Sequence, residues 1–239
     1  MDTLAKTKKG QNTKQKIIDV SKQLFYEQGF NDTTVAQITD DAEVNNGLFT
    51  YYFGSKIKLA NMVSTEYRLK LRNAVSKKMF EDFREYNLAL GIAVETRMNV
   101  KISDKYPKLL RYNIEVYSEN QSPINMNFTN FPTKKGDREV NTKRDHFYKL
   151  QKRLINPDIS DLDLKFYQVT GIAVSNSIMA AYHEGSIDCS TDYIGDKLVD
   201  ILFYMLGLDK ECIEELSHKS KVITDKLDFK LIPYFDLEY

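Results

Sequence analysis

The stretch "NNGLFTYYFGSK", residues 45–56, places four aromatic side chains within five positions, directly behind two asparagines and a glycine. Asn45 is a good N-terminal cap for a helix, because its side-chain oxygen can accept a hydrogen bond from a free backbone N–H of the first turn. Phe49 and Phe53 lie four residues apart and so share one face of such a helix. The stretch predicts a short helix with an aromatic underside and a polar N-terminal half.

The residues before this stretch predict two more helices. In the first, apolar side chains recur at helical spacing between a cap near Asn12 and Thr13 and a closing Gly29. In the second, Thr34 and Gln37 have the spacing of a capping box. Three short helices joined by tight turns form a compact trihelical unit.

The polar half of the third helix carries side chains suited to reading bases in a DNA major groove. Asparagine can form two hydrogen bonds with adenine, an apolar side chain can contact a thymine methyl group, and glycine permits close approach of the backbone. The alternative is that Tyr51 and Tyr52 are packing residues only. The residues predicted to face outward are Asn45, Asn46, Gly47, Leu48, Thr50 and Tyr51.

The run from residue 13 to residue 63 resembles the N-terminal helix-turn-helix domain of the TetR family of transcriptional regulators. The shared features are "LFYEQGF" at the end of the first helix, "TTVAQI" in the second, and V-x-x-G-x-F-x-Y-Y-F-x-S-K across the third. The resemblance implies an all-α protein with two domains. Residues 1–54 would be the helix-turn-helix domain with a basic arm, and residues 55–239 a larger helical domain for ligand binding and dimerisation.

The resemblance also implies roles for individual residues. Positions that match phosphate-contacting residues are Thr33, Thr34, Tyr52 and Lys56, whereas Asn45, Asn46 and Leu48 occupy the variable positions that select the base sequence.

Three departures from the family pattern bear on DNA affinity. Glu43 replaces the glycine usual in the turn, so a left-handed conformation there would be strained. Thr50 replaces a tyrosine and has a shorter reach to phosphate. Asp40, Asp41 and Glu43 place acids near the turn, which weakens non-specific affinity for DNA.

Charge is unevenly distributed along a chain whose formal net charge is zero. Residues 1–16 hold five lysines and one aspartate, whereas residues 185–239 hold twelve acids and six lysines. A basic arm next to a helix-turn-helix domain suits an interaction with double-stranded DNA, although a solvated lysine-rich arm is the alternative.

Composition excludes several other classes of protein. The 239 residues are 42% hydrophobic and contain no stretch apolar enough to span a membrane, and the polar N-terminus predicts a cytoplasmic protein. No HExxH, GxSxG or P-loop motif occurs, so we expect no catalytic residues and no cofactor. His183 and Cys189 form only one candidate ligand pair, which is too little to predict a metal site.

Two segments near the C-terminus predict a homodimer. Small residues keep the helix near residues 162–188 flat, and apolar residues in the following helix have heptad-like spacing. Two such helices from each of two subunits would form a four-helix bundle; the alternative is that they are core helices of a monomer. The predicted interface residues are Gly171, Ser175, Ser177, Ala181, Ile194, Leu198, Ile201, Leu202 and Met205.

The larger domain is rich in Tyr, Phe and Met, which line adaptable apolar pockets as well as helical cores. We predict a repressor that binds a palindromic operator as a dimer and is released by a hydrophobic or aromatic small molecule. The alternative is an architectural or protein-partner module that binds DNA without a small-molecule ligand. The candidate ligand-binding residues are Met98, Tyr112, Tyr117, Met126, Phe128, Phe131, Phe147 and Phe166, with residues 121–141 as a mobile wall and Glu95, Arg97 and Glu115 as possible polar anchors.

Overall fold

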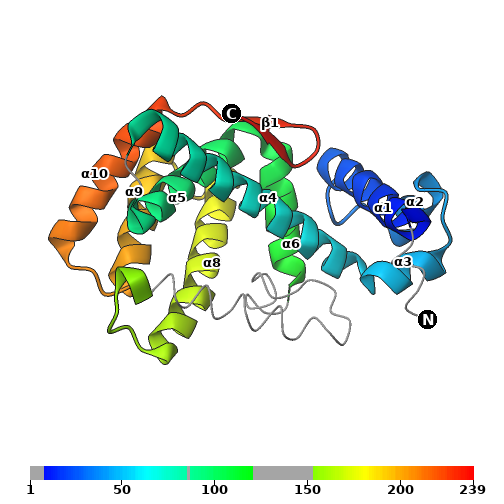
Figure 1. Ribbon diagram of the computed structural model, residues 1–239, viewed down its shortest axis with the longest axis horizontal. Helices are drawn as coiled ribbons and strands as arrows, with labels where there is room; N and C mark the ends of the chain where they lie inside the picture. The colour runs from blue at the N-terminus through cyan, green and yellow to red at the C-terminus, as the bar shows by residue number, and fades with distance from the viewer. Residues whose placement is uncertain (1–7, 85–86, 121–152) are drawn as a thin grey trace.

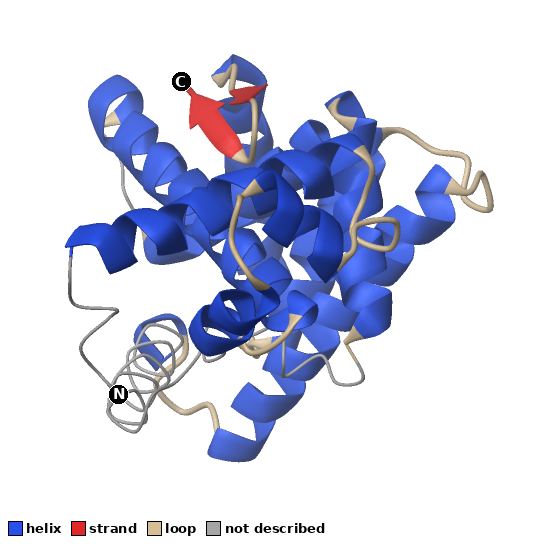
Figure 2. Ribbon diagram, turned by 90° about the vertical axis from the view of Figure 1, so that its right-hand side faces the viewer, coloured by secondary structure: helices blue, strands red, loops and turns tan. Residues whose placement is uncertain are grey.

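A computed structural model describes residues 8–84, 87–120 and 153–239 of the chain. Figure 2 shows that these residues are almost entirely helical, with a short hairpin near the C-terminus, so the all-α prediction is confirmed. The loop predicted for residues 121–141 and most of the helix predicted for residues 141–155 lie outside the described residues.

The first three helices form a small domain at one end of the molecule (Figure 1). The capping box at Thr34 and the cap at Asn45 are confirmed: each side chain accepts a hydrogen bond from a backbone N–H three residues later. The first helix already includes Lys8, so the start predicted near Asn12 and Thr13 is at least four residues too late. The Thr13 hydroxyl does not cap the helix but donates to the Lys9 carbonyl inside it. The three helices are α1 (Lys8–Glu27), α2 (Val35–Asp41) and α3 (Asn46–Phe53).

A long helix connects this domain to the rest of the molecule. It begins at the capping residue Ser55, and its last turn continues into a π-helical turn that ends at Arg84 in a left-handed conformation. Two more helices follow, divided at Pro107. These elements are α4 (Lys56–Lys78), η2 (Met79–Phe83), α5 (Leu88–Lys105) and α6 (Pro107–Glu119).

Three further helices follow among the described residues, and the last two of them pack against α5. The residues after them form an antiparallel hairpin in which Leu231 pairs with Leu237. The elements are α8 (Asp161–His183), α9 (Thr191–Met205), α10 (Lys210–Lys226), β1 (Lys230–Ile232) and β2 (Asp236–Glu238). None of the helices in the described ranges is long and apolar enough to cross a membrane.

The hairpin covers the place where α1, α4 and α6 meet (Figure 1). Phe235, which lies in the turn of the hairpin, is 1% exposed. Its ring centroid lies 4.6 Å from that of Tyr112 on α6 and 5.8 Å from that of Tyr26 on α1. Asp236 forms an ion pair with Lys70 of α4 at 3.0 Å. The C-terminal hairpin therefore joins the two domains.

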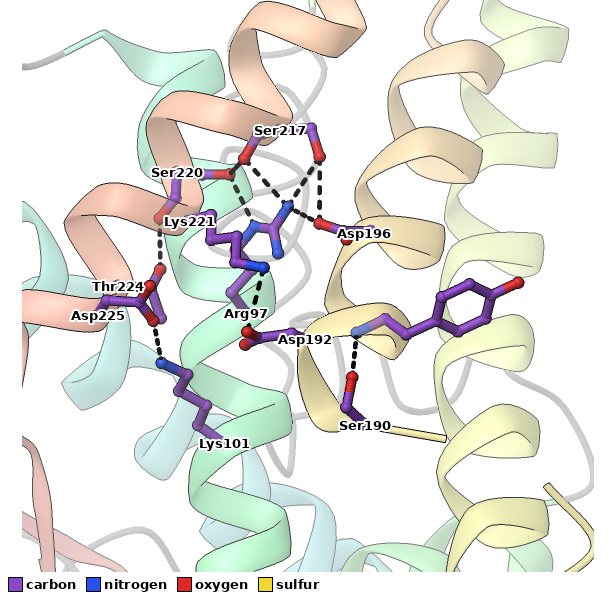
Figure 3. Close-up of polar contacts among 11 residues, drawn as sticks. Arg97, Lys101, Ser190, Asp192, Asp196, Ser217, Ser220, Lys221, Thr224 and Asp225 are labelled. Carbon is purple, nitrogen blue, oxygen red and sulfur yellow. Dashed lines mark hydrogen bonds and ion pairs between the residues drawn. The ribbon is translucent and has the colours of Figure 1, made fainter. Parts of the chain in front are cut away.

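Arg97 of α5 binds residues of α9 and α10 through hydrogen bonds and an ion pair (Figure 3). Its side chain is 3% exposed, and its guanidinium donates to Ser220 Oγ at 2.8 Å, to Ser217 Oγ at 2.8 Å and to Asp196 Oδ1 at 2.6 Å. A Cβ on Gly195 would lie 3.1 Å from the guanidinium, so a glycine leaves the room that this arginine occupies. The role of Arg97 is to hold three helices together rather than to anchor a ligand.

Candidate nucleic-acid interface and internal cavity

The aromatic underside of α3 anchors the helix to the core. Phe49 and Phe53 are each 1% exposed and Tyr52 is 8% exposed, so all three pack inward. Asn46, Gly47 and Thr50 are exposed on the opposite side, whereas Leu48 and Tyr51 are half-buried. Burial of the apolar half of α3 therefore orients its polar half toward solvent.

Hydrogen bonds fix the two asparagines at the start of α3. Asn45 Oδ1 accepts a hydrogen bond from the backbone N–H of Leu48 at 2.9 Å, so part of this side chain is committed to the cap. The Thr39 hydroxyl of α2 donates to Asn46 Oδ1 at 2.7 Å. The Asn46 amide is thus held against α2 with its nitrogen still available to donate.

Two of the predicted phosphate-contacting residues have structural partners instead. Thr33 is completely buried, and its hydroxyl donates to the Gly29 carbonyl at 2.6 Å. Lys56 Nζ donates to the carbonyls of Phe30 and Thr33 at 2.8 and 2.7 Å, and partial burial lowers the pKa of this ammonium group. Both residues stabilise the turn between α1 and α2, whereas Thr34 is exposed.

The turn between α2 and α3 contains the strain expected from its sequence. Glu43 has a φ of 52°, in the left-handed region that favours glycine. Its carboxylate accepts a hydrogen bond from Lys16 of α1 at 2.5 Å, and this bond lowers the pKa of Glu43. The ion pair ties the strained turn to α1.

The family model described as bacterial regulatory proteins of the tetR family matches residues 17–63, which span α1, α2, α3 and the start of α4. The N-terminal domain belongs to the TetR family. The matched segment contains the exposed face of α3 and the buried aromatic residues beneath it.

Comparison with individual proteins finds one sequence relative over a short segment and several solved structures at low identity. An uncharacterized HTH-type transcriptional regulator in the lacX 3′ region of Lactococcus lactis subsp. lactis is 42% identical over 45 residues, which are 19% of this chain and 23% of the relative. Among solved structures, RolR without ligand has a TM-score of 0.48 and 15% identity, covering 87% of this chain and 96% of its own. TylP, a tetR regulator from Streptomyces fradiae, has a TM-score of 0.45 and 18% identity, covering 92% and 99%. The family assignment rests on the N-terminal match.

Helix α6 of the larger domain is bonded to the end of α1 in the TetR-type domain. Glu115 Oε2 accepts hydrogen bonds from the backbone N–H groups of Phe30 and Asn31 at 2.6 and 3.1 Å. Arg111 donates to the carbonyls of Tyr26 and Glu27 at 3.2 and 3.0 Å. Glu115, suggested by the sequence as a possible ligand anchor, is therefore part of the contact between domains.

A cavity of about 210 Å³ lies in the larger domain between α4, α5, α6, α8 and α9. The charged side chains that line it, within the described part of the chain, are Arg68, Arg72 and Glu95. Arg72 binds Glu95 through two hydrogen bonds, Nε to Oε2 at 2.9 Å and a second N–H to Oε1 at 3.2 Å. Glu95 thus lies where a polar anchor was suggested, while the two arginines beside it were not foreseen.

None of the predicted ligand-binding residues that the structure describes lines this cavity. Met98 and Tyr112 are buried in the main core, where the Tyr112 hydroxyl donates to the Ala60 carbonyl at 2.7 Å. Tyr117 packs partly buried against the same core, and Phe166 is 61% exposed. Met126, Phe128, Phe131 and Phe147 lie outside the described residues. Aromatic composition alone did not distinguish a pocket from a core.

The predicted dimer residues fall into two groups. Ile194, Leu198 and Leu202 are buried within the protomer, and a Cβ on Gly171 would lie 2.9 Å from Leu202, so at this point the close neighbour of α8 is α9 of the same chain. Gly171, Ser175, Leu198 and Leu202 also line the cavity. The second group is partly or fully exposed and consists of Ser177, Ala181, Ile201 and Met205.

Proposed function

We propose that this chain is a dimeric transcriptional regulator, a repressor that binds a palindromic DNA operator and is released by a small molecule. The observation that carries the proposal is the exposed polar half of α3 in a TetR-type domain. A recognition helix uses the residues of its N-terminal half to contact base edges. Asn46, Gly47 and Thr50 meet this requirement, because they are exposed while the other face of the helix is buried.

Selection of DNA from a random library by the purified protein tests this proposal. A two-fold symmetric dimer should select an inverted repeat whose half-site centres lie about one helical turn apart, or a multiple of it. Failure to enrich any sequence, by a protein that is folded and dimeric, would contradict sequence-specific DNA binding.

Asn46→Ala tests the assignment of the reading face. The variant should change the preference at one or two base pairs per half-site, by roughly 1–3 kcal/mol at each position, because one bidentate pairing is lost. Asn73→Ala, at an exposed asparagine of α4, is the matched control and should leave the preference unchanged. If Asn46→Ala ranks operator variants as the unaltered protein does, another surface reads the bases.

Helices α8 and α9 support the dimer part of the proposal. Among the described side chains of α8, only Leu164, Tyr167 and Met179 are buried. On α9, Tyr193 and Tyr204 are 53% and 75% exposed. A mostly apolar helix that remains half-exposed in the protomer fits a surface covered by a second copy.

Ser177→Arg tests this interface. A charged side chain placed between two subunits should prevent association and abolish operator binding, although the TetR-type domain is unchanged. Ser118→Arg, at an exposed serine of α6, is the control and should remain dimeric. Light scattering measures the mass of both variants; a dimeric Ser177→Arg protein with full operator affinity would place the interface elsewhere.

The cavity supports release by a small molecule, and two helices connect it to the TetR-type domain. Helix α4 begins at the end of α3 and contributes Arg68 and Arg72 to the cavity. Helix α6 contributes Leu110 to the cavity and binds the end of α1 through Glu115. A ligand that favours one position of these helices would change the distance between the two recognition helices of a dimer. The alternative, a DNA-binding module without a ligand, predicts that no compound alters operator affinity.

A further inference from the structure

The charged side chains that line the cavity, within the described part of the chain, are two arginines, Arg68 and Arg72, and one glutamate, Glu95, so the cavity has a net positive charge. Arg72 is paired with Glu95 by two hydrogen bonds. Arg68 forms no hydrogen bond or ion pair with any other residue that the structure describes, and burial lowers the pKa of its guanidinium. Glu95 provides only a longer-range attraction to Arg68, and its carboxylate is already bound by Arg72. A cation in this position lacks the partner that buried charges normally have.

A second polar group at the cavity also lacks a partner. Tyr67 precedes Arg68 on α4, is 2% exposed and lines the cavity. Its hydroxyl is buried and has no hydrogen-bond partner among the described residues. Buried hydroxyl groups are nearly always bonded, so an orphan hydroxyl next to an orphan cation marks a place for an oxygen acceptor.

The remaining walls of the cavity are mixed: apolar side chains alternate with uncharged polar ones, among them Asn99, Asn113 and Asn176. Tyr167 and Ile172 of α8 and Leu198 and Leu202 of α9 line it opposite α4. A volume of about 210 Å³ exceeds the roughly 150 Å³ of an apolar cavity that binds benzene, so a single substituted ring can be accommodated. The cavity therefore offers an unpaired cation and an unbonded hydroxyl together with apolar surface against which a ring can pack.

We propose that this cavity binds a small aromatic carboxylic acid as its anion. The carboxylate accepts hydrogen bonds from the Arg68 guanidinium and the Tyr67 hydroxyl, and the ring lies against α8 and α9. A monoanion matches the single uncompensated charge, whereas a dianion would bring a second charge with no partner. The inference names the chemical class of the effector and so rests on the proposed function, but binding to the cavity is measurable without DNA.

A series of ligands with one shape and different charge tests the proposal on the unaltered full-length protein. The probes are 4-isopropylbenzoate, 4-isopropylbenzamide and 4-isopropylbenzylamine, with affinity measured by calorimetry and by the shift in melting temperature. We expect the benzoate to bind roughly 10- to 100-fold more tightly than the amide, because a charge-assisted hydrogen bond is replaced by a neutral one. The cationic amine should not bind. An amide as tight as the benzoate would overturn the proposal.

Two variants locate the binding site. Arg68→Gln should reduce benzoate affinity by roughly 10- to 100-fold, and Tyr67→Phe by roughly 10-fold, because the second removes one hydrogen bond without changing the shape of the side chain. Lys58→Gln, which removes a positive charge from an exposed position on α4, is the control and should bind as the unaltered protein does. Circular dichroism establishes that each variant is folded. Undiminished benzoate binding by both folded variants would also overturn the proposal.

The outcome of this test is separable from that of the proposed function. If a neutral compound, but not the benzoate, binds the protein and releases a selected operator, the carboxylate inference is wrong and the regulator proposal stands. If the benzoate binds in an Arg68-dependent manner and no DNA is selected, the carboxylate inference stands and the regulator proposal fails.

Discussion

The TetR-type domain and the cavity region satisfy their polar groups in opposite ways. At the turns of the small domain, partners are a few residues apart: Gln37 N–H donates to Thr34, and Leu48 N–H donates to Asn45. Around the cavity, Arg72 reaches Glu95, 23 residues away, while Arg68 has no hydrogen-bonding partner among the described residues. The helix caps of the first region are satisfied by neighbouring residues, whereas the second region leaves Arg68 and the Tyr67 hydroxyl available to a molecule from outside.

The C-terminal hairpin packs against both regions and joins them. The largest predicted effect concerns this junction. Phe235→Ala removes a ring that is 1% exposed and touches Tyr26 in one domain and Tyr112 in the other. The loss of burial and the resulting cavity should lower the free energy of unfolding by about 3–5 kcal/mol. Denaturant titration measures the change.

A control in the same hairpin separates packing from the presence of the strands. Ile232 is 39% exposed, so Ile232→Ala should cost less than about 1 kcal/mol. Equal losses for the two variants would mean that the hairpin does not join the domains through Phe235.

The second prediction concerns ion pairs inside the larger domain. Asp196→Ala removes the carboxylate partner of Arg97, whose side chain is 3% exposed. A buried guanidinium without a counterion should cost about 3 kcal/mol, although its bonds to Ser217 and Ser220 remain. Asp228→Ala removes an exposed pair with Lys105 and should cost less than about 1 kcal/mol. Chemical denaturation measures the free energy of unfolding of both variants. A smaller decrease for Asp196→Ala than for Asp228→Ala would show that water stabilises the Arg97 guanidinium as well as Asp196 does.

The third prediction returns to the TetR-type domain and its local bonds. Asn45→Ala removes the cap of α3 and should lower the free energy of unfolding by about 1 kcal/mol. Thr50→Ala, at an exposed position inside the same helix, should leave stability unchanged or slightly raise it. Thermal unfolding followed by circular dichroism gives the melting temperature of each variant. Equal melting temperatures would show that the Asn45 cap does not stabilise α3.

The separation in sequence between interacting residues explains which parts of the protein were predictable from its sequence. The caps at Thr34 and Asn45 and the left-handed turn at Glu43 depend on residues close together in the chain, and the sequence indicated all three correctly. The cavity depends on which faces of five helices meet, and helical periodicity does not contain that information. Apart from Glu95, its lining residues were therefore not predicted as ligand-binding residues, and aromatic residues of the core, such as Tyr112, were named in their place.

The hairpin was missed for a different reason. Leu231 and Leu237 are the buried central residues of two short strands, and Phe229, directly before the first strand, is buried as well. This alternation of apolar and polar residues is visible in the sequence. Strands of three residues give too few repeats for the pattern to stand out from an irregular tail. Their burial comes from packing on α1, α4 and α6, which the local sequence does not specify.

The smallest expected effect tests the most local feature, the left-handed turn. Glu43→Gly relieves the strain of a φ of 52°, but it removes the bond to Lys16 and gives the unfolded chain more freedom. The pair is exposed and contributes little, so we expect a rise in melting temperature that is smaller than the fall caused by Asn45→Ala.

The pH dependence of this variant separates strain from the ion pair. Lys16 lowers the pKa of Glu43 in the folded protein, so the pair stabilises the fold at neutral pH and is lost as the pH falls through that lowered pKa. The glycine variant has no pair to lose, and its advantage over the unaltered protein should therefore grow between about pH 7 and about pH 3.5. Lys16→Gln, which removes the pair and keeps the strained Glu43, should show the lower melting temperature of the two variants at both pH values. If Glu43→Gly melts below Lys16→Gln at neutral pH, the turn is not strained enough for glycine to be favoured there.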